Sequence, residues 1–322
     1  MFKNINCKNL PSLRRNIVYQ FLYELLIVFI PLFTIPYVSR VLGAENIGLF
    51  SYTYAVANYF VLFANLGIKN YGSRTIAMVR NNKEELNRNF SEILSIHIIF
   101  SIIVIFVYLV LLFFFVEDNL VIFLIQSIYV FAAVFDINWF FFGIEKFKLT
   151  VGRNTLVKIL SVFLVLVFVK TQTDLWIYAL ILALSVFVGQ SVVWFALKQY
   201  VSWRRPSWAN MKQHIRPLFV LFLPILALSL YKYMDKIMLG SISSNVQVGF
   251  YENAEKIINV PMSLIMAFGV VLMPRIANMV TSKDKGEVFK LIDMSMEAVM
   301  LLAIAISFGL AGISFVLAPI FF

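Results

Sequence analysis

The sequence predicts an all-α, polytopic helical membrane protein with about nine transmembrane helices. Hydrophobic residues make up 61% of the 322 residues and charged residues only 14%, which is far more apolar than an ordinary soluble domain. Apolar runs of about 20 residues recur along the chain, and each is long enough to cross a hydrocarbon core of ~30 Å as a helix. Alternating apolar and polar segments of the barrel type are absent, so helices are the expected spanning elements.

The expected spans follow one another along the whole chain. The basic tail, residues 1–16, precedes an apolar run that is too long for a signal peptide and has no small-residue cleavage site after it, which predicts an uncleaved first span. Pro31, Pro36, Pro224 and Pro261 lie inside or beside spans and should bend them. The spans are predicted at 17–39, 47–67, 90–116, 120–143, 149–169, 175–197, 217–240, 248–272 and 288–317.

The distribution of basic residues predicts the orientation. The N-terminal tail and the loops after spans two, four, six and eight are rich in Lys and Arg, whereas the intervening loops hold only Arg40 and Lys170. Because Lys- and Arg-rich loops stay on the cytoplasmic side, the N-terminus and every basic loop are expected in the cytoplasm. The net charge of +10 does not indicate a nucleic-acid partner, since the basic residues lie between apolar runs and not along one polar face.

A weak internal repeat recurs about two hundred residues along the chain. Gly48 precedes Arg74 by 26 positions, and Gly249 precedes Arg275 by the same 26. The two copies begin at spans one and seven, so an even number of helices separates them and they should cross the membrane in the same direction. This arrangement predicts parallel six-helix repeats related by an axis along the membrane normal.

Nine spans leave the second repeat with three of its six helices, so we expect the chain to be incomplete at its C-terminal end. The expected divisions are a cytoplasmic N-terminal tail (1–16), a first six-helix repeat (17–200), a cytoplasmic linker (201–216) and the first three helices of the second repeat (217–322).

Three sequence segments carry a family resemblance. They are P-L-F-T-I-P-Y-V-S-R-V-L-G-A-E-N-I-G-L-F-S-Y (31–52), F-A-N-L-G-I-K-N-Y-G-S-R-T-I-A (63–77), and L-P-I-L followed by D-K-I-M-L-G and V-G-F-Y-E-N-A-E-K (223–256). The chain resembles the polysaccharide flippase family, within the superfamily of multidrug, oligosaccharidyl-lipid and polysaccharide exporters. The resemblance spans essentially the whole chain, and it is more specific to the family than to any substrate.

The resemblance implies a function in surface polysaccharide biosynthesis (O-antigen, capsule or exopolysaccharide). Members of the family move oligosaccharide units linked to undecaprenyl diphosphate from the cytoplasmic to the outer leaflet, by alternating access in a fold like that of the multidrug exporters. The implied location is the bacterial cytoplasmic membrane. The implied partners are the lipid-linked oligosaccharide, membrane lipid, and the polysaccharide polymerase and glycosyltransferases of the same pathway. No bound cofactor is expected, although the family resemblance leaves room for coupling to a proton or sodium gradient.

Charged residues inside the spans are the candidate site, because charge in lipid is costly and marks functional positions. Lys232, Asp235 and Lys236 share one face of span seven, since residues three and four apart are neighbours on a helix. We assign Arg40, Lys232, Lys236 and Lys256 to diphosphate binding, because Lys and Arg bind phosphate through charge-assisted hydrogen bonds. Arg40 has an alternative interpretation as an ordinary basic helix ending before Gly43.

The intramembrane acids are candidates for ion coupling. The alternative is that these charges pair with each other between helices and lock the fold, and for Asp235 and Glu252 the two interpretations have equal weight. Lys158 is left out of the site, because it lies near the cytoplasmic boundary and can extend its amine to the membrane surface. The acids are Glu24, Asp136, Asp235, Glu252 and Glu255.

Other classes of site and function fit the sequence less well. His97 and His214 have no second His or carboxylate at ligand spacing, which argues against a metal site. The chain has no G-x-x-x-x-G-K-[ST] loop for ATP. A cation-coupled multidrug exporter of the same superfamily would favour acids with few bases in its cavity. A membrane-embedded glycosyltransferase or polymerase would need a large loop with catalytic carboxylates, and the short loops hold no D-x-D, so we do not expect an enzyme.

Overall fold

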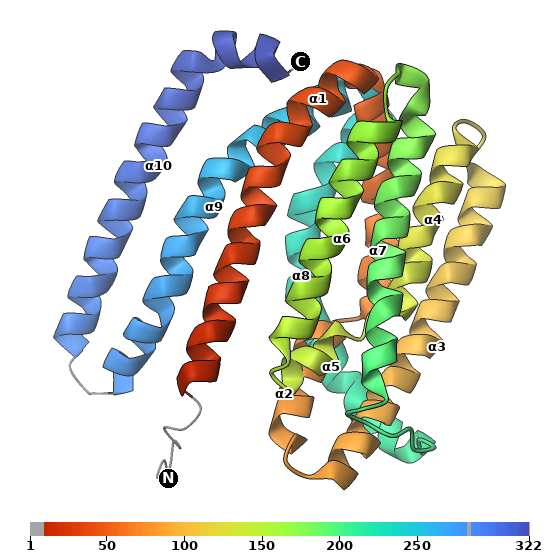
Figure 1. The fold of residues 1–322 in the computed structure, drawn as a ribbon, viewed down its shortest axis with the longest axis vertical. Coiled ribbons are helices and arrows are strands. Elements are labelled where there is room, and N and C mark those ends of the chain that lie inside the picture. Colours follow the sequence, from red (N-terminus) through yellow and green to blue (C-terminus); the bar gives the residue numbers. More distant parts are fainter. Residues whose placement is uncertain (1–9, 282–284, 322) are drawn as a thin grey trace.

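The computed structural model describes the backbone of residues 10–281 and 285–321. Side chains are described from Thr34 onward, except at 147–148, 264, 266–287, 290 and 320–321. Every regular element among the described residues is a helix, and the long helices run up and down in one bundle (Figure 1). The helices are α1 (Leu10–Asn65), α2 (Ile68–Val79), α3 (Lys83–Phe115), α4 (Leu120–Val134), α5 (Asn138–Gly143), α6 (Phe147–Phe168), η2 (Gln172–Asp174), α7 (Leu175–Leu197), α8 (Trp208–Ile242), α9 (Asn245–Thr281) and α10 (Lys285–Phe321).

Membrane-spanning helices dominate the fold, as the sequence predicts. Among the described residues, seven helical stretches are long and apolar enough to cross a membrane: Thr34–Val79, Lys83–Phe115, Leu120–Gly143, Leu149–Phe168, Gln172–Leu197, Trp208–Ile242 and Leu291–Pro319. The all-α, polytopic membrane class is therefore confirmed. The expected spans 17–39 and 248–272 are helical parts of α1 and α9, but many of their side chains lie outside the described set, so the count of nine stays a prediction.

A glycine makes the turn that was expected between the first two spans. Gly43 has φ 76° and ψ 166°, a backbone conformation that only glycine adopts readily. Its non-helical backbone divides α1 into a first arm (10–42) and a second arm (44–65). The Asn46 side-chain amide supports this turn by donating to Leu42 O at 3.0 Å and to Gln172 O at 3.0 Å. The two arms can therefore fold back on each other without a longer loop.

The fourth expected span, 120–143, is interrupted near its C-terminal end. Helix α4 ends at Val134, and α5 begins at Asn138. Asp136 Oδ1 accepts a hydrogen bond from the Asn138 backbone N at 3.0 Å and another from Asn138 Nδ2 at 2.7 Å. A short acidic side chain that binds the backbone two residues on competes with the helical hydrogen bonds, so it favours a break at this position.

Helix α8 begins earlier than expected. It starts at Trp208, whereas the linker was expected to continue to residue 216. Its first turns are amphipathic and bury Met211 and Leu218 in an apolar cluster with residues of α2, α3, α5 and α7. The linker before α8 is also anchored, because the Ser202 backbone N donates to Asn87 Oδ1 at 3.0 Å and the Arg204 backbone N donates to Ser91 Oγ at 2.9 Å.

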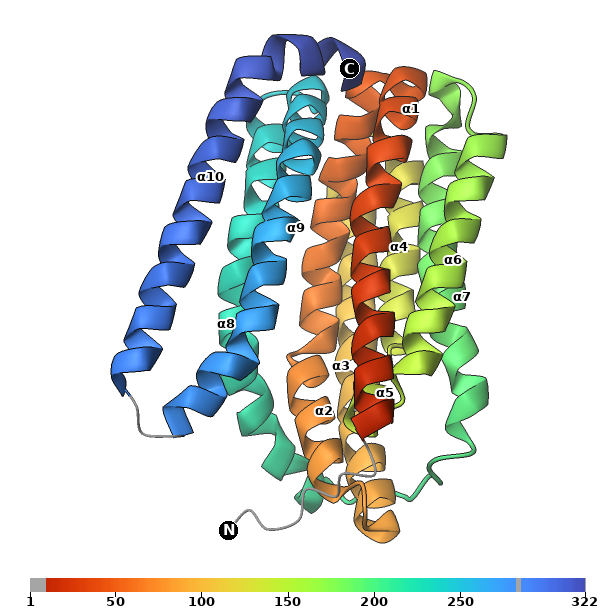
Figure 2. The ribbon, with the colours of Figure 1, turned by 60° about the vertical axis from the view of Figure 1, so that its left-hand side comes forward.

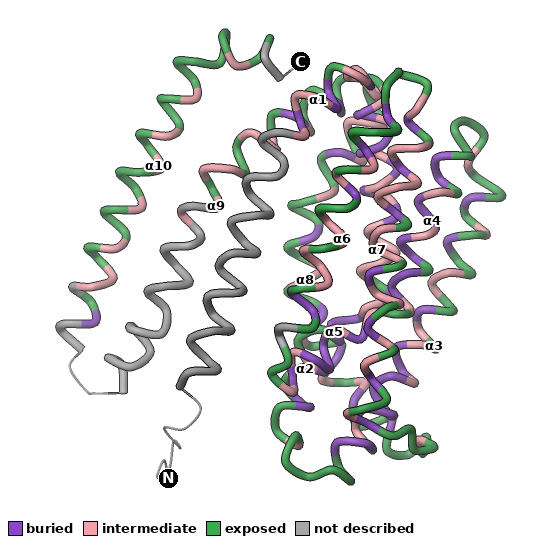
Figure 3. The backbone as a smooth tube through the Cα atoms, in the orientation of Figure 1, coloured by how far each residue is buried: buried purple, intermediate pink, exposed green. Residues whose placement is uncertain are grey.

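The two copies of the repeat meet where two helices approach closely. The second arm of α1 and helix α9 begin at the same end of the bundle and run in the same direction (Figure 2). At this end, Gly48 lies against the backbone of Asn245, and Gly249 lies against the backbone of Ala44. Figure 3 shows that burial is concentrated in the helices between α2 and α7, whereas α10 is exposed along most of its length.

Candidate functional site

A polar cavity of about 600 Å³ lies between α9 and the helices α1, α4, α5, α6 and α7. Its walls carry three cations, one carboxylate, several amides and hydroxyls, and three tyrosines. Charged groups inside a helical bundle mark substrate or ion pathways in membrane proteins. The polar and aromatic lining residues are Phe50, Tyr54, Tyr129, Asn138, Arg153, Asn154, Lys158, Ser161, Tyr178, Ser185, Gln190, Glu252 and Lys256.

Arg153 is held in the cavity wall by hydrogen bonds to three residues. Its Nη1 donates to the Gly189 carbonyl of α7 at 2.6 Å, its Nη2 to Asn138 Oδ1 of α5 at 3.1 Å, and its Nε to Asn154 Oδ1 at 3.0 Å. These bonds join α6 to α5 and α7 across the cavity wall. The planar guanidinium suits such forked contacts, because its donors have a fixed geometry.

The aromatic residues form a continuous wall. Phe50 stacks on Tyr54 with ring centroids 5.7 Å apart and meets Tyr178 edge-on at 4.9 Å, while Tyr129 meets Tyr54 edge-on at 5.1 Å. The rings come from α1, α4 and α7. A tyrosine offers an apolar face together with a hydroxyl group that donates and accepts hydrogen bonds. Such a wall suits a ligand with both apolar CH faces and hydroxyl groups.

Four charged residues that were predicted as site residues form one ion-pair cluster between α8 and α9. Lys236 Nζ of α8 lies 2.6 Å from Glu252 Oε2 and 2.7 Å from Glu255 Oε2, both of α9. Lys256 Nζ lies 3.1 Å from Glu252 Oε1. Because Lys236 is buried and both partners are charged, these are strong charge-assisted hydrogen bonds. Lys236, Glu252 and Glu255 thus make the kind of interhelical ion pair that the pairing alternative describes. Lys256 and Glu252 also line the cavity.

The other predicted site residues lie outside the cavity lining. Lys232 and Asp235 are exposed while Lys236 is buried, so the expected shared face of α8 is divided. Asp235 Oδ2 accepts from the Tyr251 hydroxyl at 2.7 Å, and Lys232 Nζ lies 5.4 Å from the Tyr233 ring centroid. Arg40 is exposed near the Gly43 turn.

Two acids complete the set of predicted residues. Asp136 is held in the break between α4 and α5 by its hydrogen bonds with Asn138. Asn138 lines the cavity and also binds Arg153, so Asp136 contacts the cavity wall through Asn138. Glu24 lies in the part of α1 whose side chains are outside the described residues.

An apolar groove of about 390 Å³ adjoins the cavity and contrasts with it in polarity. Helices α1, α9 and α10 form the groove, and Lys256 is the one charged residue among its described lining residues. Since Lys256 lines both spaces, its side chain marks the boundary between a polar cavity and an apolar groove. The remaining lining residues are Ile35, Ile257, Val260, Pro261, Ile306, Gly309, Leu310, Ile313 and Leu317.

Several cavity residues were not predicted from the sequence. Arg153 was counted with the loop residues that set orientation, and Lys158 was assigned to the membrane surface. The tyrosines Tyr54, Tyr129 and Tyr178 carry no periodic signal of their own. A usable signal exists in the number of amide and basic side chains in the spans around Asn138–Lys158 and Gln190, because such residues are rare in lipid-facing helices.

A polar cavity with three cations inside a bundle of membrane-spanning helices is typical of a membrane transporter. The chain belongs to the family described as "Polysaccharide biosynthesis protein", whose model matches residues 13–280. This match confirms the resemblance inferred from the sequence.

Two curated relatives support the same family. A protein of Escherichia coli (strain K12) named "Putative O-antigen transporter" is 27% identical over 285 residues, which cover 86% of this chain and 68% of the relative. A protein of Shigella dysenteriae with the same name is 24% identical over 281 residues, which cover 83% of this chain and 68% of the relative. No solved structure matches the chain.

Proposed function

We propose that this protein is a flippase that moves undecaprenyl-diphosphate-linked oligosaccharide units from the cytoplasmic to the outer leaflet of the bacterial cytoplasmic membrane. The observation that carries the proposal is the position of Lys256 between a polar cavity and an apolar groove. A lipid-linked sugar has the same division, with a polar head, an anionic diphosphate at the junction and an apolar chain. The names of the two relatives agree with this substrate class.

The cations have different proposed roles in binding the head group of the lipid-linked sugar. Lys256 lies at the boundary and is the proposed primary contact of the diphosphate. Arg153 and Lys158 supply further positive charge in the cavity wall. The tyrosine wall is the proposed contact for the sugar rings. Three further predicted cations line neither space in this conformation: Lys236, Lys232 and Arg40. Their proposed role is to add positive charge along the path that the diphosphate takes across the membrane.

The acids give the proposed transport cycle a means of coupling. Glu252 binds both Lys236 and Lys256, so a diphosphate at Lys256 competes with this carboxylate. Binding of a proton or sodium ion to Glu252 would weaken its hold on Lys236 and Lys256 and free Lys256 for the substrate, whereas binding to Glu255 would weaken only its contact with Lys236. Asp235, Asp136 and Glu24 remain further coupling candidates under the same proposal.

Alternating access is the proposed motion. The first six-helix repeat and the second repeat, beginning at α8, rock against each other about the close helix approach at Gly48 and Gly249, with the N-terminus in the cytoplasm. The cavity then opens to each side of the membrane in turn.

A cation-coupled multidrug exporter is the second candidate, because Glu252 is a carboxylate in the cavity wall. Three cations in the same wall disfavour it, since cationic drugs would be repelled. The two functions predict different phenotypes in cells that lack the full-length gene. Drug sensitivity with normal surface polysaccharide is the exporter's phenotype.

The test of the flippase is the leaflet distribution of undecaprenyl-diphosphate-linked oligosaccharides in those cells. Complete units trapped on the cytoplasmic face, and cleared when the gene is re-expressed, are the expected result. An unchanged leaflet distribution in the deletion strain would overturn the proposal. Reintroduction of a Lys256→Gln variant, compared with Lys232→Gln at equal protein level, tests the proposed position of the diphosphate.

A further inference from the structure

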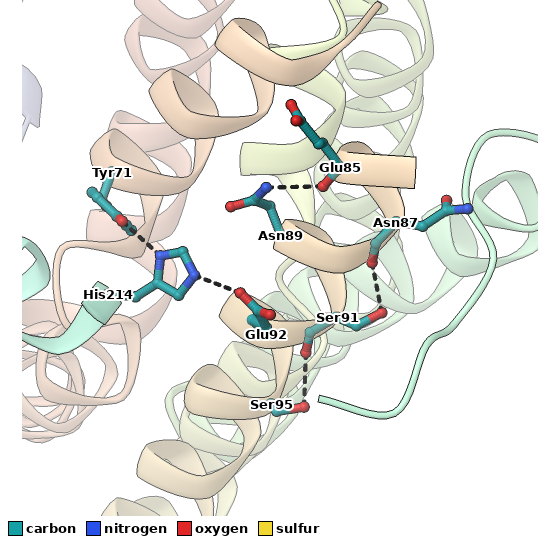
Figure 4. Close-up of polar contacts among 8 residues, drawn as sticks. All are labelled: Tyr71, Glu85, Asn87, Asn89, Ser91, Glu92, Ser95 and His214. Atoms are coloured by element: carbon teal, nitrogen blue, oxygen red, sulfur yellow. Dashed lines mark hydrogen bonds and ion pairs between the residues drawn. The ribbon is translucent and has the colours of Figure 1, made fainter. Parts of the chain in front are cut away.

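A buried histidine of α8 and a buried glutamate of α3 connect the start of α8 to helices α2 and α3. His214 Nε2 of α8 lies 2.9 Å from Glu92 Oε2 of α3, and His214 Nδ1 lies 2.6 Å from the Tyr71 hydroxyl of α2 (Figure 4). The side chains of His214 and Glu92 are only 4% and 1% exposed. The sequence places His214 in an apparent basic loop, and only the fold reveals its carboxylate partner.

The surroundings of this pair are apolar. Phe90, Ile93, Met211 and Leu218 belong to one buried hydrophobic cluster contributed by the same α3 and α8 segments. Glu92 Oε1 is buried and has no hydrogen-bond partner among the described residues. A buried carboxylate that is not fully paired is costly. Replacing a buried ion pair with apolar side chains of similar volume is often neutral or stabilising. Stability of the fold alone therefore does not explain the polar residues at this position.

The hydrogen-bond geometry leaves room for one more proton. With neutral His214, the Tyr71 hydroxyl donates to Nδ1 and Nε2–H donates to Glu92, which leaves the group of three with a net charge of −1. One added proton on Nδ1 makes both ring nitrogens donors, and the Tyr71 oxygen then accepts instead of donating. The same proton on the carboxylate also brings the net charge to zero. Proton uptake therefore removes an unpaired buried charge.

Other charged groups near the three residues point to solvent. Lys69 and Arg74 of α2, Glu85 and Arg88 of α3, and Lys212 and Arg216 of α8 are all exposed. In the linker, Arg205 is exposed and Arg204 Nη2 pairs with Glu84 Oε1 at 3.1 Å. Helix α5 has no titratable residue, and His97 is the other buried histidine, further along α3. The described ion pairs thus give Glu92 no partner besides His214.

We infer that Tyr71, Glu92 and His214 form a proton-binding site that fastens the start of α8 to α2 and α3, and that proton binding there tightens this attachment. Histidine is the side chain that ordinarily changes charge between about pH 5 and 8. A protonated imidazole forms a charge-assisted hydrogen bond with the carboxylate, which is stronger than a neutral one. Helix α8 is the first helix of the second repeat, whereas α2 and α3 belong to the first repeat. The site therefore lies between the two repeats that must move relative to each other in the proposed transport cycle.

The first test observes the proton directly and needs no transport. The chain contains two histidines, so ¹⁵N-histidine NMR of the full protein in lipid nanodiscs yields two ring environments, and His214→Gln identifies one of them. We expect the His214 ring to change from neutral to charged between pH 8 and 5. Glu92→Gln should move that midpoint to lower pH, because it removes the carboxylate that pairs with the charged ring, whereas Glu85→Gln, an exposed change on the same helix, should leave it unmoved.

Tyr71→Phe keeps the inference testable if Glu92→Gln does not fold, because it removes only one hydroxyl group. It should alter the tautomer ratio of neutral His214. A His214 ring that stays in one protonation state across this range would overturn the inference. Titration that is identical in the wild type, Glu92→Gln and Tyr71→Phe would overturn it as well. Neither result bears on the flippase proposal.

The second test measures the attachment itself. Spin labels at Lys212→Cys and Arg88→Cys, both exposed positions, report the separation of α8 and α3 once Cys7 is replaced with Ser. A narrower distance distribution at pH 5 than at pH 8, lost in Glu92→Gln, is expected. A distribution of equal width at both pH values would show that proton binding does not tighten the contact.

Discussion

Gly48 and Gly249 each pack against the backbone four residues before the other. Gly48 lies on Asn245, and Gly249 lies on Ala44. Such reciprocal contacts are the pattern that a two-fold rotation produces, because residue i meets j' and residue j meets i'. The two glycines are also equivalent positions of the sequence repeat. The contact therefore ties the internal duplication to a specific helix crossing between the second arm of α1 and α9.

Substitution of either glycine should damage this crossing. A methyl group at Gly48 or Gly249 would overlap a backbone carbonyl oxygen of the opposite helix, so Gly249→Ala should lower the free energy of unfolding by about 1–3 kcal/mol. Thermal unfolding of the purified protein in detergent measures the loss. Gly152→Ala is the matched control, because a Cβ at Gly152 meets no atom within 4 Å.

Removal of Lys236 should leave two carboxylates facing each other without their shared cation. Breaking a buried ion pair from one side costs roughly 3–5 kcal/mol. We expect the low end of that range for Lys236→Ala, since its side chain and that of Glu252 are slightly exposed, at 11% and 13%. Lys232→Ala on the exposed side of α8 should unfold at a temperature close to that of the wild type. Equal melting temperatures for the two variants would contradict a structural role for the cluster.

Arg153 should not tolerate lysine, although lysine keeps the charge. Three donors of the guanidinium reach acceptors on α5, α6 and α7, and a lysine ammonium cannot reproduce that fork. Loss of even one hydrogen bond to a charged group, about 1.5–3 kcal/mol, should reduce transport about tenfold or more. The rate at which labelled lipid-linked oligosaccharide reaches the outer leaflet measures this effect. The exposed Arg205→Lys change should leave the rate unaltered, and comparable rates for both variants would contradict the prediction.

Neutralising Lys256 should weaken binding of the diphosphate without unfolding the protein. In Lys256→Gln, Glu252 keeps its contact with Lys236, so the protein should remain folded while the cavity boundary loses its positive charge. We expect a strong loss of lipid-linked oligosaccharide transfer at normal protein level. Lys256→Arg, which keeps the charge, should retain part of the activity. Full transfer by the glutamine variant would remove Lys256 from the diphosphate site.

Much of the architecture follows from local sequence. The helical stretches confirmed as membrane-capable were predicted from apolar runs. A helix ending before Gly43 was one interpretation of Arg40, and Gly48 and Gly249 pack closely at positions that the repeat had marked. The site was predicted less completely. Glu252 and Lys256 do line the cavity, but Arg153 and Lys158 were assigned other roles, because a basic residue near a span end has the same local pattern in a loop, at a membrane surface or in a cavity.

The amino-acid sequence alone determined that this protein is a helical membrane protein, because the length and apolarity of a spanning helix are local properties. The basic loops that predict its orientation are likewise visible in the sequence. Tertiary structure decided which charges meet. Lys236 finds Glu252 and Glu255 on the next helix, and His214 finds Glu92 more than a hundred residues away, at a sequence separation of 122. Such pairs depend on how the helices rotate and pack, and no pattern within a single helix encodes that rotation.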